Sequence, residues 1–498
     1  MKYSSSLASF GLFPLALGLP KPQMTYEENS GPVGGVAAPI PIYSGPPVGD
    51  LRGSTNLQGG IASRPPISGG ASAIVEDPEL VNGQEADGKL GLYLDFNSVD
   101  SPNGPQPIRG DLGGTDPGPR THEYEKLNPD TFAPPETDSG TVPQAMWPLG
   151  LSHNLYGKKE QSGWARQQNQ DVLPIATDMA GVDMRLAPHA YRELHWHTAG
   201  EWALVLKGSV RIAATNSDGA TFIDDVTEGD VWFFPQGVPH SIQALDEGSE
   251  FLLIFDSGTF SEYDTFLATE MIMRTPVSVW AKDLQTDVSS FNDVPDEEKY
   301  IFKGTPAPAN ITEQNITSSA GALWGAASYS YHWSQQEFRN TSGGSVKILD
   351  PLTFPVAENF AAALVVLEPG AMREVHWHTD SDEWSYFLQG SARITIYAAP
   401  DSSRTFDFTA GDVGYIQKSA GHYIENTGTE DVIFLEVLQA KKFTDISAAQ
   451  WLALTPRQIV KDTINLSDEV LDNLPKEKTI IKPGNKNMTA IASSGNPE

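Results

Sequence analysis

The sequence predicts an all-β protein that contains two copies of one sandwich or barrel domain, each followed by short helices. After about Ile108, short β-branched and aromatic runs such as residues 201–206 and 251–255 alternate with Gly, Pro and Asp turns. Many short strands at near-regular spacing are typical of sandwiches and barrels. One arrangement of residues also occurs twice, 180 to 182 positions apart. A period this long indicates two copies of a domain rather than a solenoid.

The repeat is carried by short motifs. Residues 192–197 (RELHWH) recur as residues 373–378 (REVHWH). The other matched positions are Glu201 and Glu383, Gly229 and Gly411, His240 and His422, and Thr275-Pro276 and Thr455-Pro456. The last pair, a threonine N-cap before a proline at the first helical position, predicts a helix start after each barrel. The boundary between the copies is predicted near Ala320.

The chain divides into four predicted segments. Residues 1–20 combine Lys2 with an apolar stretch that is too short for the roughly 20 residues of a membrane span, so they are predicted to be a signal peptide. Residues 21–105 are rich in Gly, Pro and Ser, which is typical of an arm or linker without a packed core. The two domains are expected over residues 106–320 and 321–498.

The charge and the absence of cysteine exclude several classes of function. The 498 residues contain no cysteine, so disulfides, zinc–cysteine sites and thiol nucleophiles are excluded. A net charge of -31 argues against nucleic acid and anionic membranes as partners. We expect a secreted, extracellular glycoprotein, either free or bound to a cell wall, because five N-x-S/T sequons accompany the leader. The sequons are Asn310, Asn315, Asn340, Asn465 and Asn487.

The repeated histidines predict metal sites. On a strand His195 and His197 point to the same face, and Glu201 follows across a tight turn or at the start of the next strand. His240 joins them if the sheet folds back. Three nitrogen donors and one carboxylate suit a first-row divalent metal and leave two of six octahedral positions open. The second copy has the corresponding set His376, His378, Glu383 and His422. The donors alone leave Mn, Fe, Co, Ni and Zn open.

These residues resemble those of the bicupins, and specifically the oxalate decarboxylases. The family motif G-x5-H-x-H-x3,4-E-x6-G fits the second domain from Gly370 to Gly390, and it fits the first with His189 in the place of the opening glycine. The motif G-x5-P-x-G-x2-H-x3-N fits from Gly229, with Ala244 in the place of its asparagine. In the second domain Gln417 and Ser419 replace its proline and second glycine. The resemblance runs from about Pro107 through the C-terminal helices.

The resemblance implies two double-stranded β-helix (jelly-roll) barrels with one Mn(II) each, dioxygen as a co-catalyst, and cleavage of oxalate to formate and carbon dioxide by a homo-oligomer. It implies that Arg192 binds the substrate carboxylate, with Arg373 as its counterpart. Glu262 lies where the family has a mobile lid with a proton donor, and Glu436 resembles a glutamate near the second metal. Strict strand alternation would place Arg192 opposite His195, so the chain is expected to turn there.

Two alternatives remain open from the sequence. An oxalate oxidase or another cupin dioxygenase, such as a quercetin-type enzyme, would have similar metal ligands, and the lid glutamate favours decarboxylation because it can act as a general acid. A non-catalytic, storage-type bicupin is disfavoured because both ligand sets are complete. The first site is expected to be the catalytic one, since its domain carries the lid-like segment.

Overall fold

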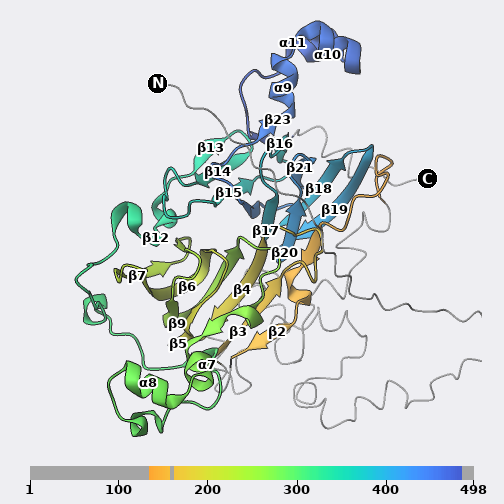
Figure 1. Cartoon of the computed structure of the whole chain (residues 1–498). Helices are drawn as coiled ribbons and strands as arrows, with labels where there is room; N and C mark the ends of the chain where they lie inside the picture. The colour runs from red at the N-terminus through yellow and green to blue at the C-terminus, as the bar shows by residue number, and fades with distance from the viewer. Residues whose placement is uncertain (1–133, 158–161, 485–498) are drawn as a thin grey trace, which may run out of the picture. The chain divides into compact units, whose positions relative to one another are not determined.

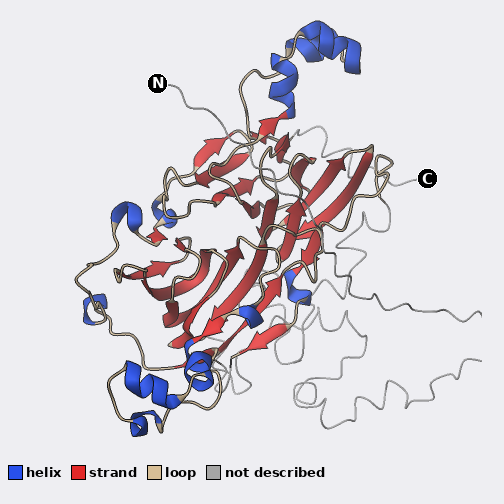
Figure 2. Ribbon diagram, viewed as in Figure 1, coloured by secondary structure: helices blue, strands red, loops and turns tan. Residues whose placement is uncertain are grey.

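The computed structural model describes residues 134–157 and 162–484 as a strand-rich protein with two barrels. Figure 2 shows that strands dominate and that helices are few and short. The predicted all-β fold with two barrels is therefore confirmed. The predicted signal peptide (1–20) and the Gly/Pro-rich arm (21–105) lie outside the described residues.

The first barrel is formed by one 11-stranded sheet. In chain order its strands are β2 (Asn154–Tyr156), β3 (Gly163–Gln168), β4 (Ala180–Leu186), β5 (Ala190–Trp196), β6 (Glu201–Thr215), β7 (Thr221–Thr227), β8 (Val231–Phe234), β9 (His240–Phe255), β10 (Phe266–Leu267), β11 (Ile301–Lys303) and β12 (Ser330–Tyr331). Their pairing is antiparallel throughout. The long strands β6 and β9 pair along most of their length and form the most extensive strand pair of this barrel.

The second barrel consists of a 7-stranded and a 6-stranded sheet. Its strands are β1 (Met146–Pro148), β13 (Arg339–Thr341), β14 (Gly344–Leu349), β15 (Ala361–Leu367), β16 (Met372–Trp377), β17 (Glu383–Gln389), β18 (Ser391–Ala398), β19 (Ser402–Thr409), β20 (Asp412–Ile416), β21 (Gly421–Asn426), β22 (Val432–Leu438), β23 (Ile446–Ser447) and β24 (Ile481–Lys482).

The two halves exchange a strand. β1 precedes the first barrel in the chain but pairs with β20 of the second, while β12 precedes the second barrel but pairs with β8 of the first. The predicted boundary near Ala320 lies in the strand-free segment between β11 and β12. Because of the exchange, each barrel needs residues from both sides of that boundary.

Alternate residues of the central strands serve two different cores. On β6, Ala203 and Val205 point into the first barrel, whereas Trp202 and Leu204 pack against the second half. The second half contributes Trp384 to the same shared core. Both faces of these strands are therefore buried, which explains why residues 201–206 read as a continuous apolar run.

Short helices follow each barrel. They are α7 (Ala268–Arg274) and α8 (Val277–Asp283) in the first half, and α9 (Ala448–Leu454), α10 (Arg457–Ile464) and α11 (Asp468–Asp472) in the second. The single 3-10 turns are η4 (Leu149–Leu151), η5 (Glu262–Asp264), η6 (Val288–Phe291), η7 (Ile311–Glu313), η8 (Gly325–Ala327) and η9 (Trp333–Gln335). Within the described ranges no helix has the length and apolar character that a membrane crossing requires.

The predicted helix starts are correct to within one residue, because α8 and α10 begin at Val277 and Arg457, but the N-cap residue is the proline and not the predicted threonine. Thr275 does not begin α8 but ends α7, and its hydroxyl donates to the carbonyl of Met271 at 2.8 Å. Thr455 ends α9 in the same way, with a 2.8 Å bond to Trp451. The following proline disfavours a helical conformation at the threonine, so the threonine ends the preceding helix in an extended conformation.

Candidate metal centres

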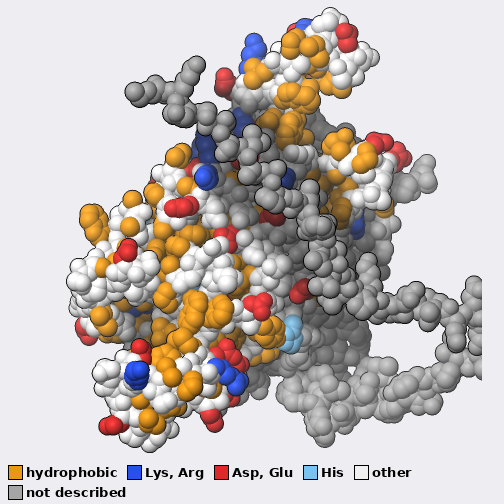
Figure 3. Space-filling model, in the orientation of Figure 1, with side chains coloured by type: hydrophobic (Ala, Val, Ile, Leu, Met, Phe, Trp, Pro, Cys, Tyr) orange, Lys and Arg blue, Asp and Glu red, His pale blue; other side chains and the backbone are white. Residues whose placement is uncertain are grey.

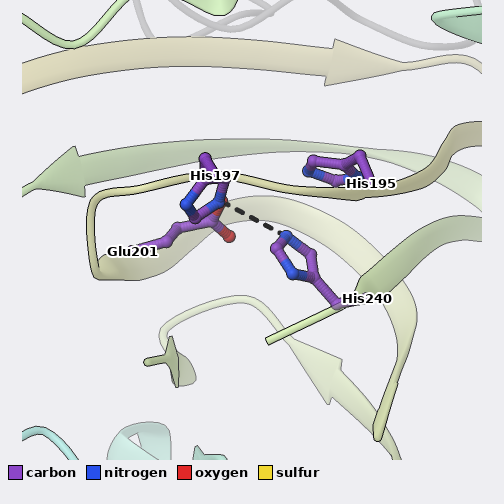
Figure 4. A group of neighbouring side chains, drawn as sticks. All are labelled: His195, His197, Glu201 and His240. Carbon is purple, nitrogen blue, oxygen red and sulfur yellow. Dashed lines mark hydrogen bonds and ion pairs between the residues drawn. The ribbon is translucent and has the colours of Figure 1, made fainter. Parts of the chain in front are cut away.

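The first predicted ligand set lies together at one end of the first barrel. His195 is in β5, His197 follows its end, and Glu201 and His240 are the first residues of β6 and β9. The Cα atoms of His195 and His240 are partners in the antiparallel pairing. All four side chains are buried, and their donor atoms lie within 4.8 Å of one another. Figure 4 shows the four side chains gathered around one point.

The second set repeats this arrangement. His376 lies in β16, His378 follows that strand, and Glu383 and His422 come from β17 and β21. These four side chains are also buried, with donor atoms within 4.8 Å of one another. The sheet therefore folds back in both halves, as the sequence required.

Backbone carbonyl groups orient the imidazoles. In the first centre the Nδ1 atoms of His195, His197 and His240 lie 2.6, 2.6 and 2.8 Å from carbonyl oxygens of Glu193, Ala199 and Val238. The second centre has the same contacts at 2.7, 2.7 and 3.0 Å, from His376, His378 and His422 to Glu374, Thr444 and Ala420. A carbonyl oxygen only accepts, so each Nδ1 carries the proton and each Nε2 has a free lone pair.

The inward-facing atoms fit a cation. Nε2 of His240 and of His376 are buried without a hydrogen-bond partner. Nε2 of His197 lies 3.1 Å from a Glu201 carboxylate oxygen, and two such acceptors repel each other unless a positive ion lies between them. Burial and the charge of Arg192 lower the pKa of His195 well below its usual value, so the ring is neutral, as a metal ligand must be.

Each ligand carboxylate is fixed by a further bond to its second oxygen. The indole Nε1 of Trp232 donates to Glu201 Oε1 at 2.8 Å. In the second centre the hydroxyl of Ser385 donates to Glu383 Oε1. Such bonds orient the carboxylate and leave its other oxygen for the ion.

A β-bulge places the arginines beside the metal sites. The register of β5 against β9 shifts between Arg192 and His195, and β16 shifts at the matching place before His376. One extra residue in the bulge cancels the alternation, so Arg192 and His195 face the same interior. The expected turn is therefore a bulge within a strand. Leu194 points outwards at the bulge and is 63% exposed.

In the first centre the arginine has free donors. Arg192 is buried, and its Nη2 donates to Glu262 Oε2 at 3.1 Å, while Nε and Nη1 have no protein partner. The Tyr300 hydroxyl donates to the same Glu262 oxygen at 3.1 Å. Burial and the charge of Glu262 raise the pKa of Tyr300 well above its usual value, so the hydroxyl keeps its proton. The two free N–H groups form a ready site for an anion.

In the second centre the arginine is occupied. Arg373 Nη2 donates to Asp445 Oδ2 at 2.8 Å, and Nε lies 3.5 Å from Glu436 Oε1. Lys478 Nζ lies 2.7 Å from the other Asp445 oxygen. Burial, opposed by Arg373, raises the pKa of Glu436 to about 7. Strand pairing places Leu253 of the first half where the second has Glu436, so the two sites differ in charge.

The sequence motifs did not predict four of these residues. Tyr300 and Asp445 contact predicted residues, and Lys478 contacts Asp445, from segments that carry no motif, while Trp232 lies within the Gly229 motif at a position that the motif leaves open. Asp445 could have been found from spacing, because it lies seven residues after the end of β22, as Glu262 does after β9. A search for acidic residues after each barrel's last long strand would have found both.

Two jelly-roll barrels, each with a three-histidine, one-carboxylate centre, define a bicupin metalloprotein. The family model described as "Cupin" matches residues 158–290 and 334–472. The chain is 44% identical over 374 residues to the oxalate decarboxylase OxdC of Bacillus subtilis, covering 75% of this chain and 96% of the relative. A probable oxalate decarboxylase of Arthroderma benhamiae is 38% identical, with coverages of 76% and 93%.

Solved structures agree with this relationship. The structure of the Bacillus subtilis oxalate decarboxylase at pH 4.6 has a TM-score of 0.70 and 43% identity, covering 76% of this chain and 98% of that one. Another structure, from work on the Mn(II) centres of that enzyme, has a TM-score of 0.70, 42% identity and coverages of 76% and 100%. The chain belongs to the cupin family and, within it, to the oxalate decarboxylases.

Proposed function

We propose that this chain splits oxalate into formate and carbon dioxide at its first centre, with Mn(II) in each barrel and dioxygen as a co-catalyst. The balanced reaction takes one oxalate dianion and one proton to one formate and one carbon dioxide. The observation that carries the proposal is the pair of unpartnered Arg192 N–H groups beside a ligand set with open positions. The named relatives and their Mn(II) centres support the metal and the substrate.

The roles of the protein groups follow from charge and position. Bound manganese would supply a Lewis acid and a one-electron acceptor for the substrate carboxylate. Arg192 binds and polarises the carboxylate through its free N–H groups. Glu262 accepts hydrogen bonds from Arg192 and Tyr300 and is therefore a carboxylate before turnover; it would take up the one proton that the reaction consumes and deliver it to the carbon of the one-carbon fragment once carbon dioxide has left. Closure of its segment over the site excludes water and bulk protons.

The test is a product balance. The manganese-loaded chain is supplied with oxalate and dioxygen, and formate and hydrogen peroxide are measured together with the metal content. We expect formate in large excess and about two Mn per chain. Glu262→Ala should shift the products towards peroxide, because oxidation of oxalate by dioxygen gives two carbon dioxide and one hydrogen peroxide. Peroxide as the main product of the unaltered chain would instead favour an oxalate oxidase.

The second centre is proposed to be auxiliary. Its arginine is bonded to Asp445 and lies near Glu436, so a substrate anion would have to displace a carboxylate. Glu436 adds negative charge or a bound proton to that interior. Loss of the His376 ligand should therefore reduce turnover less than loss of His195, measured on protein with known metal content.

We further propose a homo-oligomer held by the helices. Figure 1 shows α9–α11 extending from the second barrel, and Figure 3 shows apolar side chains on their surface. The exposed apolar residues of this arm are Trp451, Leu454, Ile459, Ile464 and Val470. Large exposed apolar patches mark interaction surfaces. Analytical ultracentrifugation should give a mass above one chain, and Leu454→Glu should lower it.

The chain is also proposed to be secreted and glycosylated. Four of the five sequon asparagines lie in the described part and are exposed: Asn310, Asn315, Asn340 and Asn465. Asn487 and the predicted leader lie outside it. When the chain is expressed in a eukaryotic secretory host, it should be found in the culture medium, and its mass should fall on treatment with an N-glycosidase. Retention inside the cell without a mass change would contradict this proposal.

A further inference from the structure

The segment that carries Glu262 is held by the side chain of one glutamine from another strand. The lid segment is defined here as residues 260–264. Gln167 lies in β3, and its Oε1 accepts the backbone N–H of Glu262 at 2.9 Å. Its Nε2 donates to the hydroxyl of Ser261 at 3.3 Å. One amide thus binds two consecutive residues of the lid segment, one of which is the proposed proton donor.

The neighbouring contacts hold the start of the lid segment from the same strand end. Asn169 follows β3 and its Nδ2 donates to the carbonyl of Phe260 at 3.0 Å. Gln167 and Asn169 are two residues apart, so extended backbone brings both side chains to one side. Phe260 stacks on Phe255 of β9 and contacts the ring of the ligand His197. The base of the segment is therefore packed, and among the bonds from β3 and its end, that of Gln167 is the one made to the backbone of Glu262 itself.

The outer side of the lid segment borders open space. A pocket of about 180 Å³ is lined by Glu262, Tyr263, Thr265 and Tyr300, among others. Tyr263 itself is 71% exposed. Glu262 is buried, and its side chain points away from solvent to Arg192. Residues 261–264 can therefore move outwards while Phe260 stays packed, provided that the bonds to Gln167, Arg192 and Tyr300 break.

The second half has no such bond. Gln167 pairs with Val182, ten residues before Arg192, and Ile348 pairs with Ala363, ten residues before Arg373. An isoleucine side chain offers no hydrogen bond. There, the carboxylate on the arginine is held by an ion pair with Lys478 instead. The Lys478 pair is charged and partly buried, whereas the Gln167 bonds are neutral, and hydrogen bonds to charged groups are typically stronger, so the bonds at the first-half position are the easier ones to break.

We infer that Gln167 is a positioning residue that latches the lid segment over the first centre and thereby sets the ratio of formate to peroxide. This inference rests on the proposed function. With the latch formed, the Glu262 carboxyl stands beside Arg192 and delivers its proton to carbon, which completes formate. With the latch open, the proton is delivered late, and dioxygen removes the electrons instead, giving peroxide.

The test compares two adjacent glutamines in the full, manganese-loaded chain. Gln167→Leu removes both latch bonds. Gln168→Leu is the matched control, because Gln168 points the other way and accepts from Trp384 Nε1. For Gln167→Leu we expect the formate-to-peroxide ratio and kcat to fall about tenfold, the size expected for one or two neutral hydrogen bonds. KM should stay within about twofold, since Arg192 is intact. Gln168→Leu should lower Tm without changing the ratio.

Amide hydrogen exchange measures how firmly Gln167 holds the lid segment, independently of catalysis. Without oxalate, the amides of Glu262 and Tyr263 should exchange about tenfold faster in Gln167→Leu than in Gln168→Leu. Equal exchange in the two variants, or an unchanged product ratio in Gln167→Leu while Glu262→Ala shifts it, would overturn the latch. If the unaltered chain makes no formate, the proposed function fails, and the exchange rates still decide whether Gln167 holds the lid segment.

Discussion

Single residues of the two halves show which departures from the family motifs matter. The turn before the last histidine has Gly237 in the first half and Ser419 in the second, with φ of 72° and 65°. Both backbone N–H groups donate to the carbonyl of the second histidine, His197 or His378, at 2.9 and 2.8 Å. The backbone conformation is thus required at both places, and glycine adopts it without a steric penalty.

The exchange of these two residues gives a matched prediction. A left-handed conformation costs a non-glycine residue about 1–2 kcal/mol, and glycine loses about 0.5–1 kcal/mol more on ordering. Ser419→Gly should therefore raise the free energy of unfolding by roughly 0.5–1 kcal/mol, and Gly237→Ser should lower it similarly. A Cβ atom at Gly237 would meet nothing within 4 Å, so strain alone is tested. Denaturant unfolding of both variants measures the change in the free energy of unfolding. If neither variant differed from the unaltered chain, that result would refute the argument from backbone strain.

Arg192 and Arg373 occupy the same motif position, but substitution of the first should mainly lower activity and substitution of the second should mainly lower stability. Arg192 has two free N–H groups, so Arg192→Met should lower kcat/KM for oxalate by about 100-fold, the loss expected for charge-assisted bonds of about 1.5–3 kcal/mol. Arg373 pairs with Asp445 and lies beside buried Glu436, so Arg373→Met should lower the free energy of unfolding by about 1–3 kcal/mol, which is less than the cost of a fully unpaired charge because Lys478 still pairs with Asp445. Steady-state kinetics and denaturant unfolding are measured on both. The opposite pattern would reverse the assignment of the catalytic site.

At the scale of elements, the bulge in β5 determines what faces the metal. Deleting Leu194 restores the alternation, so either Arg192 or the ligand histidines must turn away from the interior. Leu194 is exposed, and its loss removes nothing from the core. If the histidines turn away, the metal content should fall by about one ion per chain; if Arg192 turns away, the metal stays and kcat/KM for oxalate should fall as in Arg192→Met. Deletion of the matching Val375 tests the second centre in the same way. Full metal content together with unchanged oxalate turnover in a folded Leu194 deletion variant would contradict this role of the bulge.

The same elements show what the sequence could and could not predict. Period-2 spacing and the repeat identified the eight ligand positions, because a strand fixes the face of each side chain over a few residues. Strand alternation does not predict a bulge. A turn of the chain at Arg192 is therefore expected from the sequence, whereas the structure keeps Arg192 in the strand and shifts its side chain by a bulge. Gln167 contacts the lid segment and Tyr300 contacts Glu262 from distant parts of the chain, and no local pattern encodes such contacts. The boundary near Ala320 likewise took no account of the β1 and β12 exchange.

At the scale of the whole molecule, the shared core couples the halves. Trp384 is buried between them, and its Nε1 donates to Gln168 of the first barrel at 2.7 Å. Trp384→Ala should cost about 3–5 kcal/mol of stability, as for other buried aromatic residues. Calorimetry should show one unfolding transition in the unaltered chain, because neither barrel is complete without a strand from the other half. Two separate transitions would show that the exchange does not couple them.

A histidine that follows the exchanged strand β12 anchors it to two aspartates of the first barrel. His332 follows β12, with Nδ1 3.0 Å from Asp230 and Nε2 3.6 Å from Asp224, both in the first barrel. Ser334 also donates to Asp230 at 2.6 Å, and Lys347 of the second half acts on Asp230 through its charge. The hydrogen bond to Asp230 raises the pKa of His332 above its usual value, although partial burial opposes the shift.

Because of this contact, the stabilisation that His332 gives to the folded chain should decrease as the pH rises. Because the pKa of His332 is higher in the folded than in the unfolded chain, its stabilisation is fully present below the unfolded pKa of about 6.5. It is lost as the pH rises through the folded pKa. The Tm of His332→Gln should therefore fall further below that of the unaltered chain at pH 5 than at pH 9. A glutamine substitution of His153, an exposed histidine outside the strands, is measured beside it as the comparison. A His332→Gln difference that stayed constant or grew with pH would show that the histidine does not fasten the strand through its charge.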